Sequence, residues 1–139
     1  MALRIIPDLH RATHRVAIYL ERARALGVTQ GEAHILAHLV AAGPCTIAEL
    51  HRAFAHKRST LTSILDRLVA RGFIVRESSA VDRRTFVVRL TKTGERLARK
   101  VHEHLRSLEA LALGRVTPQQ VEGFLAVVGA IETVIDEGA

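Results

Sequence analysis

A short segment from Ala55 to Leu68 places cationic and hydroxyl side chains at its N-terminal end and an apolar stripe along its length. Lys57 and Arg58 can bond phosphate oxygens or guanine, and short hydroxyl side chains let a helix approach its partner closely. The hydroxyl residues are Ser59, Thr60, Thr62 and Ser63, and the stripe at helical spacing consists of Leu61, Ile64, Leu65 and Leu68. The segment predicts a helix anchored along one side, with its N-terminal end available for polar contacts.

A second cationic feature lies in a polar loop between two alternating segments. Phe86 to Leu90 alternates with the period of a half-buried strand, and the preceding "IVRE" segment pairs with it across the loop from Ser78 to Arg84. Arg83 and Arg84 at this tip could enter the narrow, strongly negative minor groove of DNA. Asp82 can pair with a neighbouring arginine and orient the loop.

The positive charge of the chain is concentrated around these two features. The formal net charge is +6, yet residues 51–100 hold 13 Lys and Arg against 4 Asp and Glu, or +9. Residues 1–50 are near neutral, and residues 101–139 hold 2 against 6. Such a positive block between neutral and acidic ends is typical of a phosphate-binding face, so nucleic acid is the leading partner.

Composition favours one helical domain. Apolar residues make up 48% of 139 residues and aromatic residues only 4%, so aliphatic side chains must fill the core. Cys45 is the only cysteine, which excludes an internal disulfide and gives no sign of an oxidising compartment. No stretch has the roughly 20 apolar residues of a membrane span, and the N-terminus lacks a signal-type run. We expect a soluble, cytoplasmic protein.

Capping signals place the other helices. Asp8 can cap a first helix that Gly27 ends, and "TQGE" from Thr29 reads as a capping box that starts a second helix. "TIAE" from Thr46 repeats the signal and starts a short third helix. The segment from Ala55 follows after so brief a joint that the two helices must cross steeply, in a helix-turn-helix.

The C-terminal part predicts two more helices. Thr91 opens a fifth helix, and "TPQQ" from Thr117 caps a sixth that runs to about Ile135. The sixth helix is apolar on more than one side, which exceeds what a single core-facing stripe requires. A chain this small has little core left to cover both sides, so we expect a partner subunit.

Five segments together resemble the MarR family of bacterial winged-helix regulators. They are "GVTQGEAHILAHL", "CTIAEL", "RSTLTSILDRLVARGFIVR", "VDRR" and "VRLTKTGERL", in the family's order and spacing over about residues 25 to 100. The resemblance implies a mainly α fold with a small β-hairpin wing, six helices in all. It also implies a homodimer formed by residues 1–28 and 101–139, with residues 29–100 as the winged helix-turn-helix region of a single domain.

The resemblance implies a sequence-specific regulator that binds a pseudo-palindromic operator in double-stranded DNA, usually as a repressor released by a small ligand. It assigns groove reading to the helix from about Lys57 to Arg71 and minor-groove contact to Arg83 or Arg84. The predicted DNA-binding residues are Lys57, Arg58, Ser59, Thr60, Thr62, Ser63, Arg67, Arg83 and Arg84, with Asp82 orienting the wing. A ligand pocket could be lined by His14, Tyr19, His34 and His38, although nothing in the sequence separates these from packing residues.

Two alternative functions for the same fold are the binding of a metal ion and the sensing of an oxidant. Some relatives bind zinc between the second and fifth helices, where His34, His38, His102 and His104 would lie, but His102 and His104 point to different helix faces. We therefore expect no metal and no cofactor. In oxidant-sensing relatives the reactive cysteine lies on the first helix, which has none here, so Cys45 reads as a buried structural thiol.

Two other classes of function compete with DNA binding. An enzyme is disfavoured because the chain has no glycine-rich phosphate loop, nucleophile elbow or His-Glu-x-x-His motif. A winged-helix module that binds protein would need neither the arginine tip nor the +9 block. The sequence thus predicts a cytoplasmic, nucleoid-associated DNA-binding regulator.

Overall fold

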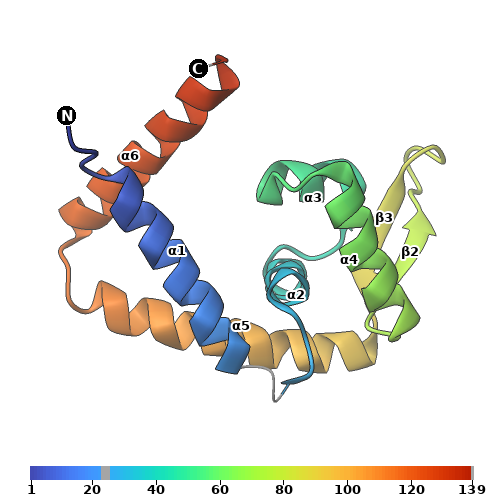
Figure 1. Ribbon diagram of the computed structural model, residues 1–139. Helices are drawn as coiled ribbons and strands as arrows, with labels where there is room; N and C mark the ends of the chain where they lie inside the picture. Colours follow the sequence, from blue (N-terminus) through green and yellow to red (C-terminus); the bar gives the residue numbers. More distant parts are fainter. Residues whose placement is uncertain (23–25, 139) are drawn as a thin grey trace. The chain divides into compact units, whose positions relative to one another are not determined.

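The computed structural model describes residues 1–22 and 26–138, which form six helices and three short strands (Figure 1). In chain order these are α1 Ile6–Glu21, α2 Gln30–Ala42, β1 Cys45–Thr46, α3 Ile47–Phe54, α4 Arg58–Ala70, β2 Ile74–Ser78, β3 Phe86–Leu90, α5 Lys92–Leu113 and α6 Pro118–Asp136. The order confirms the predicted winged helix-turn-helix with six helices. The chain divides into two compact units, Met1–His104 and Leu105–Ala139.

The start of α1 differs from the prediction. Ile5 is the N-cap and makes no side-chain cap, while Pro7 lies in the first turn, where its fixed φ suits a helix. Asp8 therefore lies inside the helix and forms an ion pair with Arg11 instead of capping. The helix ends at Glu21, and residues 23–25 of the predicted first helix lie outside the described part.

Three N-caps follow the sequence signals, but one is incomplete. Thr46 and Glu49 form a full capping box at α3, as do Thr117 and Gln120 at α6. At α2 the Thr29 hydroxyl accepts the Glu32 N–H, yet the Glu32 carboxylate does not return to the Thr29 backbone. The predicted capping box is therefore wrong for the bond from the Thr29 N–H to the glutamate side chain, because the Glu32 carboxylate pairs with Arg67 and Arg71 instead.

The sheet has three antiparallel strands in the order β1-β3-β2. Ile74 pairs with Leu90 and Ser78 with Phe86, which confirms the predicted hairpin. The third strand, β1, pairs Cys45 with Val88. This strand was not predicted, because two residues are too few to show an alternating pattern. Phe86 does not pair with β1 and is 49% exposed, so only part of β3 is half-buried.

The core of the first unit lies where α2, α3 and α4 pack with the sheet and the first half of α5. Its largest fully buried side chains are Ile35, Leu36, Leu50, Leu65, Leu68, Ile74, Val88 and Val101. All are aliphatic, as the composition requires. The apolar stripe of α4 supplies two of them, so this helix is anchored along its length.

The end of α4, the start of β2 and the start of α5 are joined around Thr91. Its hydroxyl donates to the Gly72 carbonyl at 2.7 Å and accepts the Gly94 N–H at 3.0 Å, while its own N–H donates to the Phe73 carbonyl at 3.0 Å. A Cβ placed on Gly94 would lie 1.8 Å from the Phe73 oxygen. Only glycine therefore allows this close approach.

The second unit has almost nothing buried. None of residues 105–138 falls in the buried class, although this segment is rich in aliphatic side chains. The large exposed apolar residues are Leu111, Leu113, Val116, Phe124, Leu125, Val127, Val134 and Ile135. The structure thus leaves the predicted excess of apolar surface on α6 uncovered. Among the described helices, none is long and apolar enough to cross a membrane.

Candidate nucleic-acid interface

The helix α4 separates its side chains into a buried and an exposed set. Leu61, Ile64, Leu65 and Leu68 are at most 5% exposed, whereas the hydroxyl residues predicted to contact DNA are exposed. Lys57 is the N-cap, and its side chain makes no capping hydrogen bond and is exposed at the start of the helix. The Thr62 hydroxyl donates to the Arg58 carbonyl at 2.9 Å, which leaves its lone pairs available. The N-terminal end of α4 therefore presents short polar groups to solvent.

Three residues join α3 to α4. Ala55 has φ +52°, the only positive φ of a non-glycine residue in the described ranges, and its N–H donates to the His51 carbonyl at 2.9 Å. This left-handed residue ends α3 abruptly and turns the chain. Lys57 and Arg58 then stand at the start of α4, as the helix-turn-helix prediction requires.

The wing is ordered by hydrogen bonds to its own backbone. Asp82 accepts the Arg84 N–H at 3.0 Å through its carboxylate, and its carbonyl accepts the Thr85 N–H at 3.1 Å. Within the described residues the Asp82 carboxylate forms no ion pair with Arg83 or Arg84, which are both exposed. Asp82 thus shapes the loop through the main chain and leaves the two guanidinium groups to solvent.

Two ion pairs hold the wing strands in place. Arg76 of β2 pairs with Asp66 of α4, so the hairpin is tied to the helix beside it. Arg89 of β3 pairs with Glu77 of β2 at 3.2 Å. Figure 1 shows α4 and the hairpin side by side within the first unit. The polar N-terminal end of α4 and the arginine-bearing tip of the hairpin therefore both belong to the first unit.

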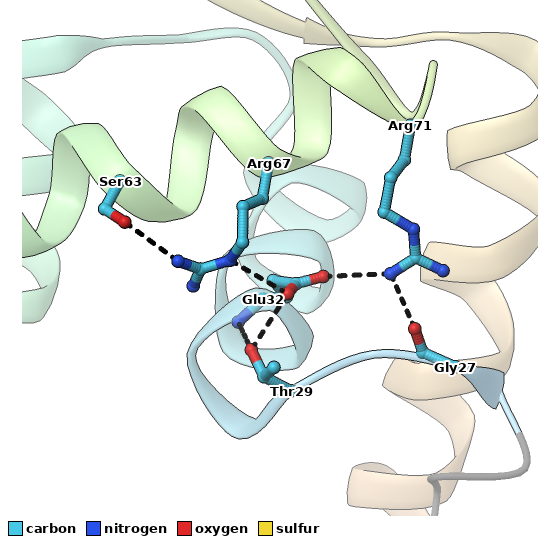
Figure 2. A network of polar contacts seen from close by, with 6 residues as sticks. All are labelled: Gly27, Thr29, Glu32, Ser63, Arg67 and Arg71. Atoms are coloured by element: carbon cyan, nitrogen blue, oxygen red, sulfur yellow. Dashed lines mark hydrogen bonds and ion pairs between the residues drawn. The ribbon is translucent and has the colours of Figure 1, made fainter.

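Arg67 differs from the other predicted DNA-binding residues. Its guanidinium donates to Glu32 at 3.4 Å and to the Ser63 hydroxyl at 2.8 Å (Figure 2). Arg71, just after the end of α4, donates to the same carboxylate at 3.2 Å. Two basic residues that follow the N-terminal end of α4 are thus engaged within the protein.

A cleft of about 560 Å³ separates the N-terminal end of α2 from α4. Its lining includes His34, His56, Ser59, Ser63 and Arg67. Burial, and after it the charge of His56, lowers the pKa of His34 below its usual value. The Nδ1 atom of His56 is buried and has no hydrogen-bond partner in the described part of the chain. The cleft has both polar and apolar lining residues, and it adjoins the exposed face of α4.

The four residues suggested for a ligand pocket have separate surroundings. Tyr19 stacks on the His104 ring at a centroid distance of 4.1 Å and donates to its carbonyl at 2.9 Å. His38 meets the edge of Phe54 at 5.3 Å. His14 is exposed, and His34 lies in the cleft beside α4. The structure does not bring these four side chains to one cavity.

The surroundings of the histidines and the cysteine bear on the metal and redox alternatives. Over residues 1–22 and 26–138, no three His, Cys, Asp or Glu side chains converge as a metal site would require. Cys45 is 4% exposed and its thiol donates to the Gly43 carbonyl at 3.2 Å. Burial, and then the charge of Glu49, raises the pKa of the Cys45 thiol, which disfavours the reactive thiolate.

Sequence reasoning missed the part played by Glu32 and Arg71. Glu32 is 2% exposed, the one buried charged residue in the described ranges. The signal in the sequence was ambiguous, because Thr29 and Glu32 have the spacing of a capping box. A glutamate three residues after an N-cap reads as a surface residue, and only its arginine partners far along the chain show otherwise.

Comparison with known proteins shows which family and which fold the chain resembles. Residues 26–85 match the model of the MarR family, which spans α2 to the wing tip. This part of the chain is similar to the MarR family. An uncharacterized HTH-type transcriptional regulator of Bacillus subtilis (strain 168), YwhA, is 30% identical over 86 residues. That alignment covers 62% of this chain and 62% of the relative, so the chain spans less than two thirds of the relative's length.

Solved structures extend the likeness in fold to nearly the whole chain. MepR of S. aureus, in its DNA-binding conformation, has a TM-score of 0.86 at 17% identity, covering 96% of this chain and 99% of its own. BpsR of Bordetella bronchiseptica has a TM-score of 0.74 at 22% identity, with 93% of each chain covered. DNA binding of BpsR is regulated by 6-hydroxynicotinic acid. The fold is thus that of these structures.

Proposed function

We propose that this chain is a sequence-specific, DNA-binding transcriptional regulator of the MarR family that acts as a homodimer. The observation that carries the proposal is the structure of α4: an apolar side buried in the core, and an N-terminal end of exposed cations and hydroxyls. In a helix-turn-helix this end of the second helix meets base edges in the major groove. The arginine-tipped hairpin beside α4 supplies a second cationic element for the same duplex.

The contacts divide into those that attract any DNA and those that select a sequence. Arg83 and Arg84 extend from the wing and would enter the minor groove or meet phosphates, where contact depends little on sequence. Arg58, Ser59 and Ser63 face outward from α4 and would meet bases. The excess of positive charge in residues 51–100 favours approach to any duplex.

Dimerisation is proposed for residues 1–28 and 101–139. The support is the exposed apolar side chains of the second unit, which has no buried residue among those described. So many exposed apolar side chains in one segment favour an interface between subunits. A two-fold dimer carries two copies of α4 and therefore matches an operator with two inverted half-sites.

We also propose that a small ligand releases the DNA and that the regulator is a repressor. The support is the family and the structural likeness to BpsR, whose DNA binding is regulated by a small molecule. A ligand that favours the non-binding conformation by about 1.4 kcal/mol shifts the equilibrium tenfold. A repressor of this kind would be associated with the nucleoid while bound.

The proposal is tested by selecting genomic fragments with the purified protein at about 0.15 M salt, where weak phosphate binding is suppressed and specific binding survives. Enrichment of an inverted repeat is the expected result. A control protein with Lys57, Arg58 and Ser63 all changed to Ala keeps the buried stripe of α4 and should enrich no repeat. Selection of the same fragments by both proteins would reject α4 as the reading helix.

A further inference from the structure

A buried carboxylate connects the exposed face of α4 to the chain that precedes α2. Glu32 uses both oxygens: Oε1 lies 3.4 Å from Arg67 Nε and 3.1 Å from the Thr29 hydroxyl, and Oε2 lies 3.2 Å from Arg71 Nη1 (Figure 2). The Glu32 side chain is 3% exposed, whereas those of Arg67 and Arg71 are 48% and 41% exposed. The carboxylate is fixed, and the two guanidinium groups come to it from the surface.

Arg71 extends the same network to the turn before α2. Its Nη1 atom also donates to the Gly27 carbonyl at 2.6 Å, and its guanidinium lies 4.9 Å from the centre of the Phe73 ring. Glu32 thus holds the C-terminal half of α4 against both α2 and the preceding turn. Arg67 lies in α4 and Arg71 is the C-cap four residues further on, so the carboxylate contacts two positions about one helical turn apart.

Arg67 connects the Glu32 carboxylate to Ser63, one of the residues predicted to contact DNA. Its Nη1 atom donates to the Ser63 hydroxyl oxygen at 2.8 Å. A guanidinium has donors only, so Ser63 must be the acceptor in this bond. The proton of the Ser63 hydroxyl is then directed away from Arg67, toward whatever lies against the exposed face of α4.

We propose that Glu32 is a positioning residue for DNA recognition, which keeps Arg67 within the protein and thereby presents the Ser63 hydroxyl as a hydrogen-bond donor. The inference rests on the proposed DNA-binding function. A donor at this place favours base edges that offer acceptors in the major groove: guanine N7 and O6, adenine N7 or thymine O4. The same contacts would keep Arg67 from adding to phosphate binding.

The test uses the substitution Glu32→Gln in the full-length protein. Glutamine keeps the size of the side chain but removes the charge, so the half-exposed Arg67 turns to the bound duplex and contacts a phosphate. The slope of log affinity against log salt should then become steeper by about 0.9, the value of one phosphate contact. Discrimination against a substituted base pair opposite Ser63 should fall by about 5- to 10-fold, as the donor loses its fixed orientation.

Glu49→Gln is the matched control, because Glu49 holds the same position after its N-cap in α3 but is exposed and contacts no arginine of α4 among the described residues. It should leave the salt slope and the discrimination unchanged. Arg67→Gln is the second variant, should Glu32→Gln fold poorly. It should weaken discrimination with no steeper slope, since no released cation remains.

The outcomes separate the inference from the function on which it rests. A wild-type protein without sequence preference would overturn the proposed function itself. A wild-type protein that selects an operator, with Glu32→Gln matching it in both salt slope and base preference, would overturn only the role of Glu32. For a poorly folded Glu32→Gln, unchanged discrimination in Arg67→Gln would be equally decisive against that role.

Discussion

Single side chains around α4 and the wing differ in what they can give a DNA duplex. Arg84 has its backbone fixed by Asp82 and its guanidinium in solvent, whereas Ser63 is oriented by a neighbouring arginine. A solvent-exposed cation mainly adds affinity for any duplex, whereas an oriented hydroxyl mainly adds specificity. The division of labour within the interface can therefore be tested residue by residue.

Arg84→Ala should weaken binding to every sequence to a similar extent, and it should flatten the salt dependence by about one unit of slope. Arg58→Ala or Ser63→Ala should instead change which operator variant is preferred, by about 1–3 kcal/mol at the contacted base pair. Titrations of the operator and of single base-pair variants at two salt concentrations measure both effects. Equal loss of specificity from the two kinds of change would contradict this division.

At the scale of helices and strands, the wing depends on its junction with α5. Gly94→Ala should lower the free energy of unfolding by about 1–3 kcal/mol or more, because a Cβ would lie 1.8 Å from the Phe73 carbonyl oxygen and the backbone must shift. Thr93→Ala, one residue away and exposed, should change it by less than about 0.5 kcal/mol. Urea denaturation of both variants measures the difference, and equal stabilities would show that the close approach is unimportant.

The elements that the sequence predicted well are those whose signals are local. The capping boxes at Thr46 and Thr117, the helical stripe of α4 and the hairpin each depend on patterns within a short stretch of the chain. What could not be predicted depends on distant partners. The strand β1 exists only because β3 lies beside it, and Glu32 is buried only because Arg67 and Arg71 reach it.

For the whole molecule, the exposed apolar residues of the second unit predict a dimer. Leu125→Glu should convert the dimer to a monomer and weaken operator binding strongly, because a charge would be placed within an apolar interface. Val75→Glu, at an exposed apolar residue of β2 outside the proposed interface, should leave the dimer intact. Sedimentation measurements distinguish the two, and a Leu125→Glu protein that remains dimeric would reject α6 as an interface.

The most direct test of the whole account is the spacing of operator half-sites. A dimer that inserts two copies of α4 into successive major grooves requires half-site centres about 10 base pairs apart. Insertion of about five base pairs between them turns one half-site to the opposite side of the duplex and should reduce affinity to that of a single half-site. Binding that is unchanged by this insertion would contradict a dimer that reads DNA through its paired α4 helices.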